Sequence, residues 1–389
     1  MKKRKLLMIP GPIEFEPAVL QALGEPTTSH VAPDFISIFG QSLDMMREVW
    51  QAPAAQPFIL AGSGTLAMDS AGANMIEPGD NALVISTGYF GDRYANLLER
   101  YGANVNILKS ELGATVSDER IEAELQKGAY KVLTFTHVDT STAVKVDPRA
   151  IGKLGRRYGV VTILDGVCSV AGEEIRQAEW GIDIVLTASQ KAIGVPPGLA
   201  LLMVSPEAME VWKNRKTAVG NYYADWNNWL PIMEAYKERR PSYFATPAVN
   251  LVASLKVSLE HIIEEGMDAR FKRHMVGGKA FRAAFKSLGL SQIPLNDNIA
   301  ANTLSAPYFP DGINGQDLLS AINRAGVITA GGLLPGIKDK YFRIGHMGAV
   351  SKNDIIVTIS AIESGLSNCG YSFEQGSGLV SALSVLNNI

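Results

Sequence analysis

The chain has 389 residues, of which 47% are hydrophobic and 19% are charged, and its formal net charge is -3. This length predicts about two to three domains, and the composition is that of an ordinary globular protein rather than a disordered or fibrous one. The small net charge gives no reason to expect nucleic acid or an anionic membrane as a partner. No stretch approaches the roughly 20 apolar residues of a membrane span.

The two ends of the chain and its cysteines carry few signals. Cys168 and Cys369 lie far apart, so we expect neither a disulfide framework nor a thiolate metal site. The apolar run near the start stops at Pro10, which is too short for a signal-peptide core, and we expect residues 1–18 to form an arm. The C-terminus lacks the peroxisomal Ser-Lys-Leu signal. We therefore expect a cytoplasmic protein, with the peroxisome left open.

Between about residues 58 and 205, short apolar runs alternate with helical stretches. This rhythm is typical of parallel strands joined by crossover helices. Several runs are continuously apolar, as a sheet covered by helices on both faces requires. The expected strands are Asn81 to Ser86, Val132 to Thr136, Val160 to Leu164, Ile182 to Thr187 and Leu199 to Val204. We expect a large, doubly wound, mainly parallel α/β domain over residues 19–263.

Beyond Pro247 the pattern changes, and a long helical run through Leu251 and Ile263 leads out of the large domain. We expect a smaller α+β domain over residues 264–371. Its expected strands are Ala301 to Ser305, Val327 to Thr329 and Tyr341 to Ile344, and its expected helices are Gly315 to Ala325 and Lys352 to Leu366. Residues 372–389 then form either a docked helix or a frayed tail.

One carboxylate and one lysine stand at matching places in the predicted sheet. Asp165 ends a buried strand, and Lys191 lies just past the end of a later strand. Because the carboxyl ends of parallel strands face the ligand crevice, both side chains can act on one ligand. A lysine can condense with an aldehyde, and a carboxylate can keep a pyridine nitrogen protonated. Each residue alone is more often a cap or a surface charge, but together they predict pyridoxal 5'-phosphate.

A phosphate site is the next requirement of that cofactor. Residues 61–65, Ala-Gly-Ser-Gly-Thr, come directly before a helical stretch from Leu66 to Ile76. Backbone amides at a helix N-terminus, together with serine and threonine hydroxyls, favour a bound phosphate. The segment lacks the Walker lysine and does not fit Gly-x-Gly-x-x-Gly, which disfavours a nucleotide.

The order of these motifs resembles the class V aminotransferases of pyridoxal phosphate fold type I, and in particular the alanine:glyoxylate branch. The resemblance covers roughly residues 6 to 366. The segments that carry it are Ile9 to Pro12, Ala61 to Thr65, Thr136 to Thr142, Asp165 to Ser169, Ser189 to Ala192, Tyr243 to Pro247 and Arg343 to Gly348. The resemblance implies a pyridoxal phosphate fold type I enzyme.

The resemblance implies specific roles around the cofactor. Lys191 would form the internal Schiff base, and Asp165 would pair with the pyridine nitrogen. The residues implied around the phosphate are Ser63, Gly64, Thr65 and Gln190. Ser141 would lie beside the 3-hydroxyl of the ring, and Val167 would pack on one ring face. Phe90 would stack on the other face, where many relatives have a tryptophan, although it could also belong to the core.

The resemblance also implies a dimer and a substrate anchor. Tyr243 and Thr246 match positions that reach the phosphate of the neighbouring subunit, which implies a homodimer with shared active sites. Arg343 would hold the substrate carboxylate, since a guanidinium can bind it through two parallel hydrogen bonds; without that context an arginine here could equally be a structural ion pair. Gly11 could add a backbone contact to the substrate.

The expected reaction is transfer of the amino group of a small amino acid, L-alanine, to glyoxylate by a ping-pong mechanism. Serine:glyoxylate and serine:pyruvate transfer are the nearest alternatives, because shape alone excludes one added hydroxyl poorly. Cysteine desulfuration fits badly, because Phe90 stands where it needs a histidine. A scaffold protein that keeps the fold without activity is the non-enzyme alternative. The histidines lack metal spacing, so we expect no metal.

Overall fold

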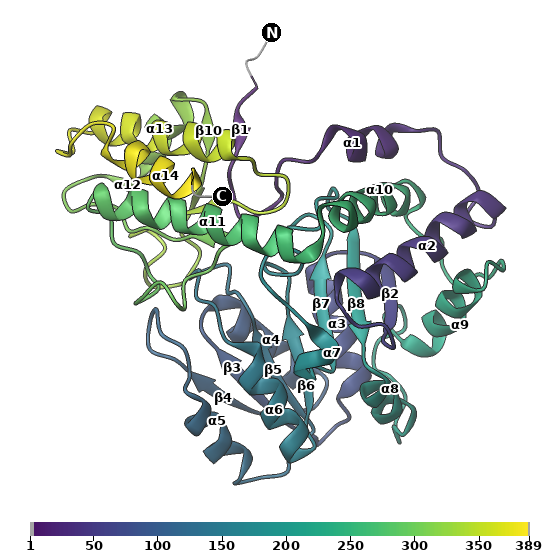
Figure 1. Cartoon of the computed structure of the whole chain (residues 1–389). Coiled ribbons are helices and arrows are strands. Elements are labelled where there is room, and N and C mark those ends of the chain that lie inside the picture. Colours follow the sequence, from purple (N-terminus) through teal and green to yellow (C-terminus); the bar gives the residue numbers. More distant parts are fainter. Residues whose placement is uncertain (1–3, 388–389) are drawn as a thin grey trace.

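The computed structural model describes residues 4–387, so residues 1–3 of the expected arm and 388–389 of the expected tail lie outside the described residues. Its centre is a seven-stranded sheet with the order β2-β8-β7-β6-β5-β3-β4 (Figure 1). The strands are β2 Gln56–Ala61, β3 Asn81–Ser86, β4 Asn104–Lys109, β5 Val132–Thr136, β6 Val161–Asp165, β7 Ile184–Ala188 and β8 Leu199–Val204. The predicted α/β fold with a mainly parallel sheet is confirmed.

The sheet differs from the sequence-based expectation at both of its edges and in the direction of one strand. Pattern analysis missed β2 and β4; β4 is an edge strand that keeps Asn104 and Asn106 among its residues, so it lacks an apolar run. Strand β8 is antiparallel to both β7 and β2. Only residues 189–198 separate β7 from β8, and this is too short for the crossover that a parallel connection needs.

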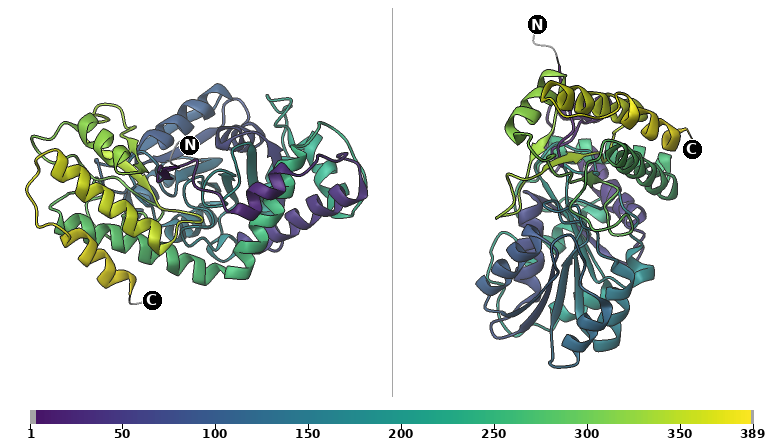
Figure 2. Two further views of the ribbon diagram at one scale, coloured as in Figure 1. Left: turned by 90° about the horizontal axis from the view of Figure 1, so that it is seen from above. Right: turned by 90° about the vertical axis from the view of Figure 1, so that its left-hand side faces the viewer.

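Helices cover both sides of the sheet, as the right-hand view of Figure 2 shows. Those of the sheet region are α3 Gly64–Met75, α4 Tyr89–Arg100, α5 Asp118–Leu125, α6 Pro148–Tyr158, α7 Gln177–Trp180, α8 Pro206–Lys213 and α9 Trp226–Lys237. Strands β5 to β8 are buried along their whole length between these layers. This burial explains why their sequences are apolar without alternation.

A second group of elements, from the C-terminal part of the chain, lies at one end of the sheet (Figure 1). These elements are α11 Met267–Ser287, β9 Leu304–Ser305, α12 Gly315–Arg324, β10 Val327–Ile328, β11 Ala330–Gly331, β12 Phe342–Gly345, α13 Lys352–Asn368 and α14 Ser377–Leu386. They surround a separate hydrophobic cluster that includes Phe281, Ile322 and Leu366. Helix α14 packs against α11, so most of the expected tail is a docked helix. The domain boundaries at 263 and 371 stay predictions.

The N-terminal segment connects the two groups of elements. Strand β1, Leu6–Leu7, pairs in parallel with β10. The chain then crosses to α1 Pro17–Gly24 and α2 Pro33–Val49, which pack against α10 Val249–Glu265. No helix within the described residues is both long enough and apolar enough to cross a bilayer.

Candidate active site

A cavity of about 160 Å³ lies where the parallel strands β5, β6 and β7 end. Strand register brings Thr136, the last residue of β5, beside Asp165, the last residue of β6. The chain reaches the cavity again after β7, at Lys191. The lining residues are Ser63, Gly64, Thr65, Met68, Phe90, Thr136, Val138, Thr140, Asp165, Val167, Cys168, Gln190 and Lys191. The fold thus brings together most of the residues that the sequence nominated.

The Asp165 carboxylate is buried at the floor of this cavity, with a relative exposure of 2%. It accepts a hydrogen bond from the Val167 amide at 3.0 Å and one from the Thr136 hydroxyl at 3.5 Å. Burial raises the pKa of Asp165 to about 6, and the nearby Asp139 carboxylate adds to the shift. The protein alone therefore stabilises this charge poorly, and a protonated ring nitrogen opposite it would supply the missing positive partner.

Lys191 lies in the same cavity and is also buried. Its ammonium group donates to the carbonyl of Pro10, in the segment that crosses from β1. Burial lowers the pKa of Lys191, and the positive charge of Arg343 lowers it further. Gly11 has a φ of +112°, and a Cβ there would lie 2.6 Å from the Lys191 side chain. A glycine is therefore required where the arm passes over the lysine.

The N-terminus of α3 opens onto the cavity and is suited to an anion. Ser63 is its N-cap residue but makes no side-chain capping bond, so the amides of the first turn lack that partner. Gln190 also lines the cavity, and its buried Oε1 accepts no hydrogen bond from residues 4–387. The Arg93 guanidinium donates to the Thr65 hydroxyl at 2.8 Å and adds positive charge beside this turn. Amides, hydroxyls and a cation together favour a phosphate.

Phe90 lines the cavity from the first turn of α4. The buried Asp139 carboxylate fixes this turn, since it accepts from the amide of Phe90 at 3.0 Å and from that of Gly91 at 3.4 Å. The same carboxylate accepts a hydrogen bond from the Ser141 hydroxyl at 2.6 Å. Ser141 is thus engaged with Asp139 and does not itself line the cavity. Its expected contact with the ring hydroxyl stays a prediction.

Arg343 points from β12 toward the same region. Its Nε donates to the carbonyl of Gly331 at 2.9 Å and its Nη1 to the carbonyl of Thr140 at 3.2 Å. Its Nη2 makes no hydrogen bond with the described residues, and it has no ion pair there. This arginine is therefore held by neutral carbonyls, which fixes its direction and leaves its charge uncompensated. An anionic group of a ligand would complete its coordination.

Two expected cofactor residues do not reach this cavity. Tyr243 and Thr246 lie in the segment between α9 and α10, and neither is among the lining residues. The Tyr243 side chain is 63% exposed. Their expected role at the phosphate of a neighbouring subunit stays a prediction.

Several residues of the site escaped the sequence analysis. Arg93 follows Phe90 by three positions on α4, and this spacing could have indicated that both lie on the same face of the helix. Tyr341 is fully buried, and its hydroxyl donates to the carbonyl of Ser141 at 2.6 Å. The same hydroxyl accepts from the amides of residues 333 and 334 at 2.8 Å. No local pattern predicts this bridge, because it joins segments 200 residues apart.

Residues 4–387 contain no group of three histidine, cysteine, aspartate or glutamate side chains arranged to hold a metal ion. Cys168 lines the cavity, and burial raises the pKa of its thiol, which disfavours the reactive thiolate.

Comparison with known proteins identifies the family. The family model described as "Aminotransferase class-V" matches residues 19–335. The chain is 40% identical over 362 residues to alanine–glyoxylate aminotransferase 1 of Saccharomyces cerevisiae, covering 89% of this chain and 93% of the relative. The chain is a class V aminotransferase. Serine–glyoxylate aminotransferase of Arabidopsis thaliana is 28% identical over 391 residues, covering 99% of this chain and 96% of the relative.

A solved structure of the family has the same fold. The ureidoglycine–glyoxylate aminotransferase of Bacillus subtilis superposes with a TM-score of 0.93 at 28% identity, covering 100% of this chain and 99% of that one. The cofactor of this aminotransferase is pyridoxal 5'-phosphate, as its family implies. The residues present fit that group: the uncapped turn of α3 and the Thr65 hydroxyl suit the phosphate, and the buried Asp165 suits a protonated ring nitrogen.

The pKa of Asp165 makes a prediction about the cofactor-free aminotransferase. An aspartate titrates near 3.9 in an unfolded chain but at about 6 here, so the folded state binds more protons between these values. Stability therefore falls as the pH rises through this window, and the loss remains above it. At pH 8, cofactor-free Asp165→Asn should exceed the cofactor-free wild type in free energy of unfolding by roughly 2–3 kcal/mol.

Urea unfolding of both cofactor-free proteins at pH 8 and pH 4 measures this difference. At pH 4 Asp165 is protonated in the folded state and about half protonated in the unfolded chain, so the two proteins should agree within about 1 kcal/mol. Equal stabilities at both pH values would contradict a destabilising buried charge.

Proposed function

We propose that this enzyme transfers the amino group of L-alanine to glyoxylate, giving pyruvate and glycine. The observation that carries the chemistry is the burial of Lys191 and Asp165 in one cavity beside the uncapped N-terminus of α3. The choice of substrates is supported by the 40% identity to the yeast alanine–glyoxylate aminotransferase. The similarity covers 93% of that relative.

The protein groups divide the work of the reaction. When bound, pyridoxal phosphate supplies a carbonyl that takes up the amino group and a ring that takes up electrons. Lys191, whose pKa is lowered by burial, removes the proton from the α-carbon of the amino acid. Asp165 holds a proton at the ring nitrogen. The product oxo acid then leaves before the second oxo acid enters, which is a ping-pong order.

Arg343 orients the substrate. Its two bonds to backbone carbonyls involve Nε and Nη1, and Nη2 has no hydrogen bond with the described residues, so it can bind the α-carboxylate without first breaking an ion pair. A preformed donor of this kind reduces the entropy that substrate binding costs. Gly11 is close to the Lys191 side chain and is thus placed near the reacting carbon, where its backbone can add a further contact.

A panel of amino donors tests the proposed reaction. Purified holoenzyme is assayed with L-alanine, L-serine and L-aspartate, each paired with glyoxylate and with pyruvate. L-Alanine with glyoxylate should give the highest kcat/KM. Lys191→Ala should lose turnover with every pair, because no other amine lines the cavity within the described residues. A higher kcat/KM for L-serine would show that L-serine, and not L-alanine, is the amino donor. Wild-type turnover in Lys191→Ala would overturn the mechanism.

Substitution of Arg343 should affect the substrate and not the cofactor. In Arg343→Gln the kcat/KM for L-alanine should fall about 100-fold, the effect of roughly 3 kcal/mol in a charge-assisted contact. The visible absorption of the bound cofactor should be unchanged. Arg324→Gln, at the exposed end of α12, is the matched control and should behave as the wild type. An unchanged kcat/KM in Arg343→Gln would rule out the anchor.

We also propose a homodimer in which Tyr243 and Thr246 complete the cavity of the neighbouring subunit. The exposure of Tyr243 and its absence from the cavity of its own chain support this arrangement. Mixing inactive Lys191→Ala subunits with Tyr243→Ala subunits tests it. One of the two cavities in a mixed dimer would then contain only native residues, so activity should rise above that of either variant. Chromatography of a labelled mixture verifies that the subunits have exchanged. If exchanged dimers show no gain in activity, the two subunits do not share their active sites.

A further inference from the structure

The hydroxyl of Tyr341 makes three hydrogen bonds in the interior of the protein, where its side chain is fully buried. It donates to the carbonyl of Ser141 at 2.6 Å, and it accepts from the amides of Leu333 and Leu334 at 2.8 Å. A tyrosine hydroxyl has one proton to donate and lone pairs with which to accept, so this group has all its partners. Tyr341 thus joins the segment that follows β5 to the segment that follows β11.

The same two segments hold Arg343. Its guanidinium donates to the carbonyls of Thr140 and Gly331, which lie one and two residues before the groups that Tyr341 contacts. Tyr341 and Arg343 stand two positions apart where the chain enters β12. An extended chain directs such side chains to the same side. The hydroxyl therefore bonds to the neighbours of both carbonyls that orient the arginine.

The segment after β11 depends on this tyrosine for its place. Strand β11 has only two residues, and residues 331–340 are exposed or half-buried. A Cβ at Gly332 would lie 2.6 Å from the Tyr341 ring, so the backbone there packs directly on the ring. Without the hydroxyl, two amides and the carbonyl of Ser141 would lose their partner. Such a loss is unfavourable, and a shift of the backbone relieves it. A shift on either side would move a carbonyl that holds Arg343.

We propose that Tyr341 is a positioning residue for the substrate, because its hydroxyl keeps in place the two carbonyls that orient Arg343. The inference rests on the proposed function, in which Arg343 binds the α-carboxylate. An arginine that is oriented in advance binds its ligand at a lower cost in entropy, so the bridge acts on the affinity for the amino acid. Tyr341 is not among the lining residues of the cofactor cavity, so the cofactor itself should be unaffected.

Tyr341→Phe removes only the hydroxyl and tests the proposal. Purified holoenzyme is mixed rapidly with L-alanine, and the change in the cofactor's visible absorption is followed at a series of alanine concentrations. The apparent Kd for L-alanine should rise about tenfold. The limiting rate and the spectrum before mixing should stay close to those of the wild type. An unchanged Kd, or a changed spectrum before mixing, would overturn the proposal.

A double variant shows whether Tyr341 acts through Arg343. In the Arg343→Gln background, the addition of Tyr341→Phe should change kcat/KM by less than about twofold, because the group that the bridge positions is gone. A further fall of about tenfold would mean that the hydroxyl acts by another route, and it would overturn the proposal. If Arg343→Gln alone equals the wild type, the anchor of the proposed function fails and this inference fails with it. An unimpaired Tyr341→Phe beside an impaired Arg343→Gln overturns this inference alone.

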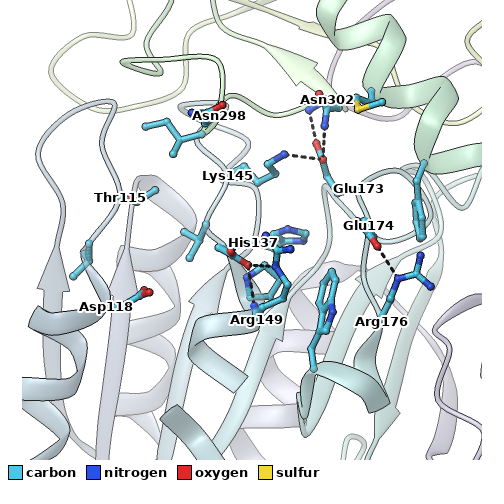
Figure 3. Close-up of a pocket in the computed structure, with 18 of the residues that line it drawn as sticks. Thr115, Asp118, His137, Lys145, Arg149, Glu173, Glu174, Arg176, Asn298 and Asn302 are labelled. Atoms are coloured by element: carbon cyan, nitrogen blue, oxygen red, sulfur yellow. Dashed lines mark hydrogen bonds and ion pairs between the residues drawn. The ribbon is translucent and has the colours of Figure 1, made fainter. Parts of the chain in front are cut away.

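The sheet region and the second group of elements also meet on the other side of the end of β5, around a second cavity of about 490 Å³ (Figure 3). His137 lines this cavity, whereas Thr136 lines the cofactor cavity, because successive side chains of a strand point to opposite sides. There Glu173 accepts a hydrogen bond from the Asn302 side chain at 2.9 Å and pairs with Lys145 at 3.4 Å. The two cavities share no lining residue, so this contact can be weakened separately from the Tyr341 bridge.

Two control variants separate the bridge from general effects. Tyr308→Phe removes a hydroxyl that makes no hydrogen bond with residues 4–387, from the residue that pairs with Tyr341 in an isolated β-bridge. Asn302→Ala weakens the contact in Figure 3. Both variants should keep the wild-type Kd for L-alanine, although Asn302→Ala should unfold at a lower urea concentration. A rise in Kd of about tenfold in either control would show that Tyr341→Phe reports only a general loosening, and it would overturn the proposal.

Discussion

The rest of the active site depends on the carboxylate of Asp165, which is buried at the end of β6 and requires a positively charged partner. A charge in such a place is unfavourable without a positive partner, and two hydrogen bonds only partly offset that cost. Burial also lowers the pKa of Lys191 in the same cavity. The protein thus holds a buried acid that lacks a positive partner and a lysine whose pKa is lowered by burial, and a protonated pyridine aldehyde can bind to both.

Positions around this pair are fixed by backbone contacts more than by other charged side chains. Pro10 accepts from Lys191, and the carbonyls of Gly331 and Thr140 hold Arg343. Neutral carbonyls orient a cation without neutralising it, so Arg343 keeps its charge for an anionic substrate. The Asp139 carboxylate fixes the position of Phe90 because it accepts a hydrogen bond from the Phe90 amide. Segments that are distant in the sequence therefore orient the side chains of the site, while the strand ends provide the reactive groups.

The end of β5 lines two separate cavities. Alternate residues face opposite sides, so Thr136 contacts the cofactor cavity and His137 the second one. Sequence analysis treated His137 only as part of a family motif. That its Nδ1 makes no hydrogen bond within residues 4–387 became visible only when the neighbouring segments were in place, because the absence of a hydrogen bond depends on every element around it.

The sequence by itself determined the buried parallel strands and the reactive residues at their ends. Continuous apolar runs predicted β3, β5 and β8 with their observed bounds; Asp165 is the last residue of β6, and Lys191 lies three residues past the end of β7. It could not reveal β4, whose edge position tolerates asparagines, or the reversed direction of β8, which depends on the length of one loop. Only the tertiary structure decided that Gly11 passes over Lys191 and that Tyr341 ties Ser141 to residues 333–334. These contacts join distant segments, so no local periodicity encodes them.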